Sequence, residues 1–424
     1  MSATSKTGRA ALVAANGRAR RPSEPPQGDL SHAEAQRGGE RRDLWFGEVP
    51  DGWVVKRLAS YFSERKVKVS DKDFPPLSVT KNGILPQLEN VAKTDDGDNR
   101  KLVRKGDFVI NSRSDRKGSS GLSEYDGSVS LINLVLKPRG GLFGAYCNYL
   151  LKSLSFVEEN YRNGRGIVAD LWTTRYDEMK MIKVAMPPLP EQKAIVAYLD
   201  AETGRIDKAI AAEEKMIALL QERREIVINE AVGGGDLSHA EAQRGRGWEI
   251  VPAKRICTMQ AGKNLTSLEI QQTGEFPVYG ANGQRGWYSK YNCDGDYLLV
   301  GRQGALCGNV HHVNGRFWAT DHALITKIVD GVNIPFAYYL FSAANFNQYA
   351  SQTAAQPGLA ARQILNVKVI LPPLPEQEAI VERLDRETGK IDRAIEVKRR
   401  QIELLRERRQ IVIDEVVTGK MKVA

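Results

Sequence analysis

The chain has 424 residues, a hydrophobic content of 42% and a formal net charge of +9, and it is long enough for two or three domains that each bury a core. No apolar run approaches the roughly 18 residues of a membrane span and no signal sequence opens the chain, so we expect a cytoplasmic protein. The four cysteines form no C-x-x-C pair and the five histidines include one adjacent pair, which gives no basis for a metal site or a disulfide framework.

Residues 1–42 are rich in Ala, Arg, Gly and Ser and hold almost no large apolar side chains, a composition typical of a disordered tail. This basic tail carries a net charge of +4, and so do the segments 43–186 and 246–371. Positive charge on those segments suits a polyanionic partner, although it is a weak signal by itself. The sequence GDLSHAEAQRG occurs at 28–38 and again at 235–245, and we assign it no function.

Segments 43–186 and 246–371 are predicted to be two globular domains with the same order of elements. Short β-branched and aromatic runs bounded by Asn-Gly, Asp-Gly and Arg-Gly-Gly turns predict strands. In the first domain the predicted strands are 53–58, 77–80, 107–110 and 129–136, followed by a helix at 143–157. In the second domain they are 248–250, 276–279, 297–300 and 323–328, followed by a helix at 335–346.

Each domain leads into a long predicted helix, and the two helices are copies of one another. Residues 187–232 match residues 372–417 at 29 of 46 positions, which indicates a duplicated unit. Both copies begin Pro-Pro-Leu-Pro-Glu-Gln, a helix start at which Pro190 and Pro375 lose no hydrogen bond. We expect a linker at 233–245, the second helix over 372–419 and a short tail at 420–424.

Apolar residues in both helices recur at alternating spacings of three and four, the heptad pattern of a coiled coil. We call the residues at these spacings the seam. Its two polar members, Glu213 in the first helix and Lys398 in the second, stand at equivalent positions and carry opposite charges. In an antiparallel pair with a pseudo-twofold axis they would face each other; that both bend into solvent is an equally good alternative. The predicted seam residues are Leu199, Ile206, Ile210, Glu213, Ile217, Leu220 and Val227 in the first helix and Leu384, Ile391, Ile395, Lys398, Ile402, Leu405 and Val412 in the second.

Three loops that follow predicted strands combine glycine with cationic and amide side chains. Such side chains reach base edges in the major groove, and glycine lets backbone N–H groups approach phosphates. Taken alone, each loop is more simply interpreted as an ordinary solvated turn. Only the recurrence of such loops in both domains favours the interpretation that they bind DNA. The candidate DNA-binding residues are Asn111, Arg113, Arg116 and Lys117 in the first domain and Asn282, Arg285, Arg302 and Gln303 in the second.

Sequence motifs of catalysis are missing from the chain. It contains no G-x-x-x-x-G-K-[ST] phosphate loop, no H-E-x-x-H and no G-x-S-x-G. None of the four Pro-Pro pairs stands in the Asn/Asp-Pro-Pro-aromatic motif of an adenine methyltransferase, and those at 187–188 and 372–373 stand at helix starts. A single-chain enzyme such as a nuclease is therefore disfavoured.

The segment order, the paired Pro-Pro-Leu-Pro-Glu-Gln starts, the Ile-Val-x-x-Leu-Asp continuations at 195–200 and 380–385, and the Gly-Trp pairs at 52–53 and 247–248 form one pattern. Over about residues 45–420 it resembles the specificity subunit of type I restriction-modification systems. The resemblance implies an α+β fold: two mixed α/β target-recognition domains held apart by two long antiparallel helices that form a coiled coil with a pseudo-twofold repeat.

The resemblance also implies a non-catalytic subunit that reads an interrupted site in double-stranded DNA. Two methyltransferase subunits would dock on the helices, restriction subunits could join them, and S-adenosylmethionine and ATP would bind to those partners. The alternative is a coiled-coil scaffold whose globular domains bind other proteins.

Overall fold

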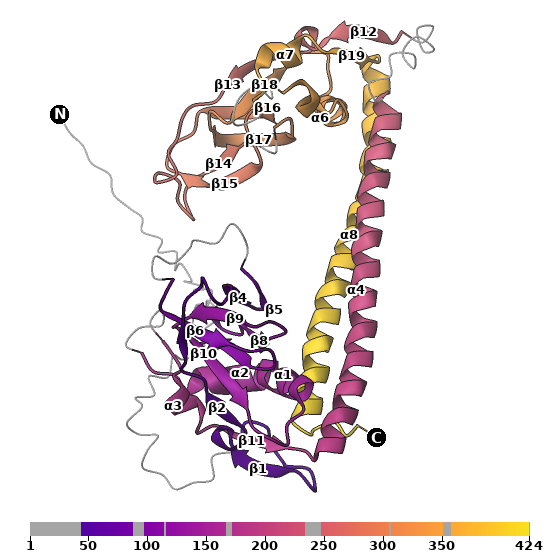
Figure 1. The fold of residues 1–424 in the computed structure, drawn as a ribbon. Helices are drawn as coiled ribbons and strands as arrows, with labels where there is room; N and C mark the ends of the chain where they lie inside the picture. The colour runs from indigo at the N-terminus through magenta and orange to yellow at the C-terminus, as the bar shows by residue number, and fades with distance from the viewer. Residues whose placement is uncertain are drawn as a thin grey trace, which may run out of the picture.

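The computed structural model describes residues 44–87, 97–113, 116–166, 172–233, 247–304, 307–350 and 358–423. The predicted tail 1–42 and both copies of GDLSHAEAQRG lie outside the described residues. Two mixed α/β domains sit at opposite ends of a rod of two long helices (Figure 1). We call them domain 1, residues 43–186, and domain 2, residues 246–371.

The rod consists of α4 (Leu189–Val232) and α8 (Leu374–Val417), each 44 residues long. At 1.5 Å per residue each helix spans about 66 Å. The two run antiparallel and side by side along their length (Figure 1). Two α/β domains joined by a paired, repeated helix confirm the predicted α+β class.

A tryptophan of each domain is fastened to the first turn of that domain's own helix. The indole Nε1 of Trp53 donates to the Glu191 carboxylate at 2.8 Å, and Trp248 donates in the same way to Glu376. Both carboxylates lie at the N-terminal, positive end of the helix dipole. The Gly-Trp and Pro-Glu-Gln motifs of the sequence therefore contact each other in both domains, through a hydrogen bond from the tryptophan to the glutamate.

The next side chain of the motif, a buried glutamine, continues the attachment. Gln192 accepts from the backbone N–H of Phe143 at 2.8 Å, and Gln377 accepts from that of Asn333 at 2.8 Å. Both glutamines are 1% exposed, so the hydrogen bonds are needed to offset their burial. Each domain is thereby held in a fixed orientation on its helix.

Domain 1 contains eleven short strands and three α-helices within its described residues. The strands are β1 (Val54–Arg57), β2 (Phe62–Glu64), β3 (Lys68–Val69), β4 (Leu77–Thr80), β5 (Gly83–Pro86), β6 (Arg100–Val103), β7 (Phe108–Asn111), β8 (Ser120–Leu122), β9 (Gly127–Ser130), β10 (Asn133–Pro138) and β11 (Lys183–Met186). The helices are α1 (Gly144–Lys152), α2 (Leu154–Arg162) and α3 (Tyr176–Met179).

Domain 2 has fewer and longer strands. They are β12 (Glu249–Pro252), β13 (Cys257–Ala261), β14 (Phe276–Gly280), β15 (Gly283–Tyr288), β16 (Cys293–Gly301), β17 (Val310–Ala319), β18 (Ala323–Ile328) and β19 (Lys368–Leu371). Among its described residues the α-helices are α6 (Ile334–Ala343) and α7 (Ala361–Leu365).

The two domains share one sheet order. Domain 1 has β2-β10-β7-β8, and domain 2 has β13-β18-β16-β17, extended by β14 and β15. A separate antiparallel pair, β1 with β11 or β12 with β19, leads the chain into the rod. The duplication indicated by the helices therefore extends through the domains.

Two predicted elements of domain 1 are each split in the structure. The strand predicted at 129–136 turns at Leu131 and Ile132 into β9 and β10, because β9 pairs with β6 whereas β10 pairs with β2 and β7. An apolar run without Gly or Pro gives no sign of such a turn. The helix predicted at 143–157 breaks at Ser153, whose hydroxyl caps α2 by accepting from the Phe156 N–H at 3.3 Å.

Each domain core is completed by both rod helices. Leu199 of α4 and Val412 and Val416 of α8 belong to the buried cluster of domain 1. Val227 of α4 and Leu384 of α8 belong to that of domain 2. The end of each helix thus packs into the domain at the start of the other helix.

The structure places the predicted seam residues between the two helices or at their ends within the domain cores. Of the apolar ones, seven are buried and the rest are half-buried. Glu213 and Lys398 lie 2.9 Å apart, carboxylate oxygen to ammonium nitrogen. The buried apolar members are Leu199, Ile206, Val227, Leu384, Ile395, Ile402 and Val412.

Candidate nucleic-acid interface

The loops that follow β7 and β16 occupy equivalent places in the two domains. In domain 1 the Ser112 carbonyl accepts from the Thr174 N–H at 3.1 Å; in domain 2 the Arg302 carbonyl accepts from the Leu359 N–H at 2.8 Å. The next residue, Arg113 or Gln303, forms an isolated β-bridge in each case. Arg113 and Gln303, predicted separately, are thus structural counterparts.

Arg113 is exposed beside an open groove of about 470 Å³ in domain 1. Lys66, Lys101 and Arg175 add positive charge to the groove, and the two lysines are both paired with Glu64, at 3.3 Å and 3.2 Å. Within the described residues the guanidinium groups of Arg113 and Arg175 have no ion-pair partner. The turn between β9 and β10 adds two apolar side chains, Leu131 and Ile132, which are 37% and 39% exposed.

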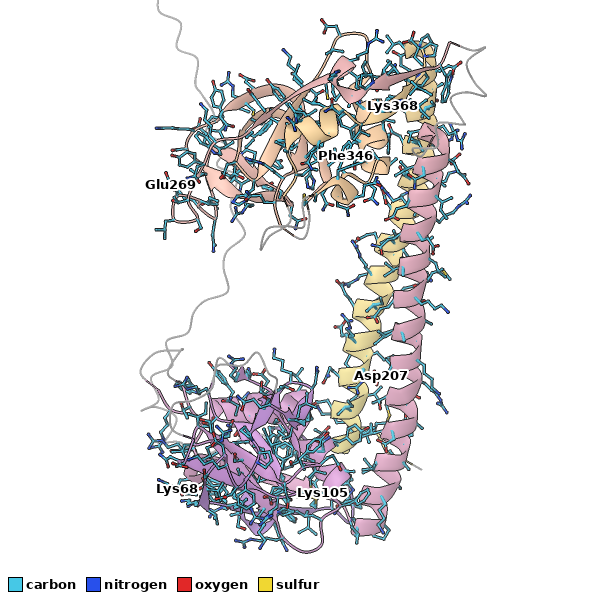
Figure 2. All side chains as sticks on the ribbon, turned by 45° about the horizontal axis from the view of Figure 1, so that its top comes forward. Lys68, Lys105, Asp207, Glu269, Phe346 and Lys368 are labelled. Carbon is cyan, nitrogen blue, oxygen red and sulfur yellow. The ribbon has the colours of Figure 1, made fainter. Side chains whose placement is uncertain are left out.

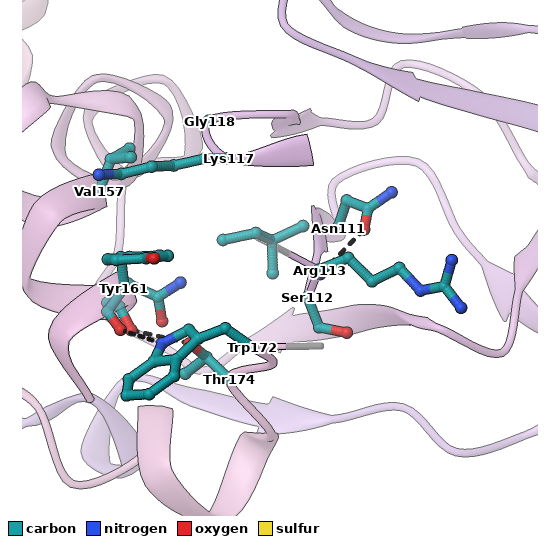
Figure 3. A pocket seen from close by; sticks show the side chains of 11 residues that line it. Asn111, Ser112, Arg113, Lys117, Gly118, Val157, Tyr161, Trp172 and Thr174 are labelled. Carbon is teal, nitrogen blue, oxygen red and sulfur yellow. Dashed lines mark hydrogen bonds between the residues drawn. The ribbon is translucent and has the colours of Figure 1, made fainter. Parts of the chain in front are cut away.

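Lys117 and Asn111 hold the same loop in place, and neither lines this groove. The Lys117 ammonium lies 2.7 Å from the Glu158 carboxylate and 4.3 Å from the ring centroid of Tyr161. The Asn111 side-chain oxygen accepts from the Arg113 N–H at 3.1 Å. Figure 3 shows the Arg113 guanidinium pointing away from Lys117 and Tyr161. Arg116 is exposed and lies between Arg113 and Lys117 in the loop.

A small pocket behind the loop is lined by aromatic side chains that no sequence motif indicated. Trp172 lies against Tyr161, with ring centroids 5.8 Å apart, and its indole N–H donates to the Tyr161 carbonyl at 2.7 Å (Figure 3). The rings, together with Lys117, brace the segment that pairs with Arg113. Their role in the structure is to position the loop.

In domain 2 the structure places Asn282 and Arg285 on a β-hairpin, whereas the sequence suggested a loop. Asn282 is exposed at the turn between β14 and β15, and Arg285 is exposed on β15. The side chain of Arg285 lies across Gly280, where an added Cβ would stand 2.7 Å from its Cδ. Glycine at position 280 therefore permits this placement of the arginine.

The equivalent hairpin in domain 1 consists of β4, which was predicted as a strand at 77–80, and β5, which was not predicted. Its turn consists of Lys81 and Asn82, both exposed and followed by a glycine with φ of +117°. Both hairpins carry Asn-Gly, which favours a tight turn and could have revealed the match. The β4–β5 and β14–β15 hairpins lie on the sides of the domains that face each other (Figure 1).

Cys147 and Cys257 are deeply buried. Burial raises the pKa of Cys147 and of Cys257 to about 12, so both thiols stay protonated at neutral pH and are poor nucleophiles. The parts of the chain that the structure describes hold no His, Cys, Asp and Glu cluster suited to a metal ion. No helix among them is long and apolar enough to cross a membrane.

A family model described as the type I restriction modification DNA specificity domain matches residues 245–405. The EcoprrI specificity subunit of Escherichia coli is 39% identical over 150 residues, which cover 34% of this chain and 37% of that protein. The MjaVIII specificity subunit of Methanocaldococcus jannaschii is 26% identical over 420 residues, which cover 88% of this chain and 94% of that protein.

The fold also has a counterpart among solved structures. A chain from a study of complex assembly and conformational transition of a type I R-M system superposes with a TM-score of 0.65 at 18% identity, covering 88% of this chain and 100% of that one. The duplicated helix, the repeated domains and these similarities agree with one another. The chain matches the type I restriction modification DNA specificity domain over residues 245–405 and is similar to the specificity subunits of type I restriction-modification systems.

Proposed function

We propose that this chain is the non-catalytic, DNA-reading subunit of a type I restriction-modification complex. Each domain reads one half of an interrupted sequence in double-stranded DNA, and the rod holds the two domains apart. Because the domains differ in sequence, the recognised site is asymmetric.

The observation that carries the proposal is the pair of equivalent loops at opposite ends of one rod. Arg113 and Gln303 stand at the same structural position, one a cation suited to guanine and the other an amide suited to adenine. Helices of about 66 Å separate the domains by more than one turn of B-DNA, which is about 34–36 Å. Two contacts on one face of a duplex can therefore be made without contact to the bases between them.

The remaining functions are assigned to partner subunits. Two methyltransferase subunits dock on the rod helices and supply S-adenosylmethionine chemistry, and restriction subunits supply ATP-driven cleavage. This division agrees with the absence of catalytic motifs in the sequence. The same complex would be found in the cytoplasm.

The test is selection of bound duplexes from a random pool by the chain in complex with its methyltransferase. We expect two fixed half-sites with a constant gap. Arg113→Ala should relax the preference at one position of one half-site, at a cost of about 1–3 kcal/mol in binding, and Gln303→Ala should relax one position of the other half-site.

Lys105→Ala is the matched control, since Lys105 is exposed at the opposite end of β7 from Arg113. It removes the same charge and should leave the selected sequence unchanged. If no sequence is enriched and binding to duplex DNA is insensitive to salt, the scaffold alternative replaces the proposal.

A further inference from the structure

The pair Glu213–Lys398 lies on the pseudo-twofold axis of the rod. The repeat offset is 185 residues, so position 213 of α4 corresponds to position 398 of α8. Their side chains are in contact at 2.9 Å and are 24% and 30% exposed. Only at the axis does a residue face its own counterpart.

Two ion pairs away from the axis are related by the same symmetry, whereas the exposed pair Arg406–Glu214, at 3.1 Å, has no such mate because its counterparts are Gln221 and Arg399. Arg224 pairs with Asp392 at 2.9 Å, and Arg409 pairs with Asp207 at 3.0 Å. Each helix carries both an arginine and an aspartate at these positions, so two copies of α4, or two copies of α8, could form the same two bonds. The apolar seam residues are likewise identical in the two copies. Neither the two arginine–aspartate pairs nor the apolar seam distinguishes a like pair from an unlike pair.

The residues at the middle of the rod do distinguish a like pair of helices from an unlike pair. Two α4 helices would bring two Glu213 carboxylates together, and two α8 helices would bring two Lys398 ammonium groups together. The surrounding sequences reinforce the difference: 211–216 is AAEEKM with a net charge of −1, and 396–401 is EVKRRQ with a net charge of +2. Like charges at a half-buried contact repel and are less screened than at the surface.

We propose that the middle of the rod, residues 211–216 and 396–401, is a partner-selecting surface. It accepts one α4 against one α8 and rejects a second copy of the same helix. Two copies of this chain can therefore not pair α4 with α4 or α8 with α8. Every assembled rod carries one domain 1 and one domain 2. The selection concerns the helices alone and is independent of what the domains bind.

Three full-length variants test the proposal. The first carries AAEEKM at both segments, the second carries EVKRRQ at both, and the third has the two segments exchanged. The exchanged chain has the wild-type composition, so intrinsic helix propensity is unchanged in sum. Thermal unfolding midpoints are measured in about 0.05 M and about 1 M salt, where the Debye lengths differ several-fold.

We expect the two chains with the same segment at both places to melt about 2–4 °C below wild type at low salt, and the differences to shrink at high salt. The exchanged chain restores the central pair but loses the exposed Arg406–Glu214 pair, so it should melt above both of them. Glu213→Lys should lower the midpoint more than the control Glu222→Lys, which reverses an exposed charge on the same helix. An exchanged chain that falls by the sum of the two like-paired losses would overturn the proposal, as would equal losses from the two single variants.

Discussion

Lengthening the rod by one heptad on each helix should widen the gap between the half-sites. The insertions must lie opposite each other, and the contact between Glu213 and Lys398 shows where opposite positions are. Duplicating residues 207–213 in α4 and residues 398–404 in α8 places two new segments face to face with the seam in phase. A further Glu–Lys pair and a further apolar layer then extend the existing pattern.

The expected lengthening is seven residues at 1.5 Å, about 10.5 Å, or about three base pairs at 3.4 Å each. The assay is the selection of bound duplexes described above, together with mapping of methylated adenines when the methyltransferase is present. The gap should increase by about three base pairs with both half-sites unchanged. Some loss of activity is expected, because three base pairs rotate one half-site by about a third of a turn.

A control variant carries the same two seven-residue insertions at positions that do not face each other. Heptads after Leu219 and after Leu404 are at equivalent positions of the repeat but on opposite sides of the axis, so each displaces a helix end from the domain core that it completes. This variant should fail to fold correctly. A folded, active chain with facing insertions that still selects the original gap would refute the idea that the helices measure the site.

Three further outcomes follow from the contacts. Leu199→Ala removes a fully buried side chain and should cost about 2–5 kcal/mol of stability, measured by denaturant unfolding, whereas Leu219→Ala at an exposed position should change stability by less than about 0.5 kcal/mol. Cys147 and Cys257, with pKa values of about 12, should resist thiol reagents at pH 8 until the chain unfolds; labelling of the native protein at a free-thiol rate would contradict this. Glu191→Gln removes a charge-assisted hydrogen bond from Trp53 and should cost about 1–2 kcal/mol, seen as a lower unfolding midpoint by tryptophan fluorescence.

The long helices could be predicted from the sequence because their signals are local and repeated. Heptad spacing, proline at each start and the internal identity all indicate the same elements, and the equivalence of Glu213 and Lys398 follows from counting. The hairpins and the sheet pairing of the domains were harder to predict from the sequence. β9 and β10 are separated by two apolar residues, and only their different partner strands explain the turn.

Site residues were harder to predict than the fold because neighbours in sequence face different ways. Arg113 and Lys117 belong to one loop, yet one borders an open groove and the other is held by Glu158 and Tyr161. Side-chain direction in a loop depends on tertiary partners far along the chain. The correspondence of Arg113 with Gln303 likewise emerges only from backbone hydrogen bonds to distant segments.

The completion of domain 1 by α8 has a consequence for the order in which the protein is made. The Tyr146 hydroxyl contacts the Val417 carbonyl, and Asp414 accepts from both the N–H and the hydroxyl of Ser155. These partners are more than 250 residues apart, so on the ribosome the first domain is synthesised long before its core can close. At roughly 5–20 residues per second the open face waits roughly ten seconds or longer. Domain 1, although first in sequence, is thus the last part of the molecule to be finished.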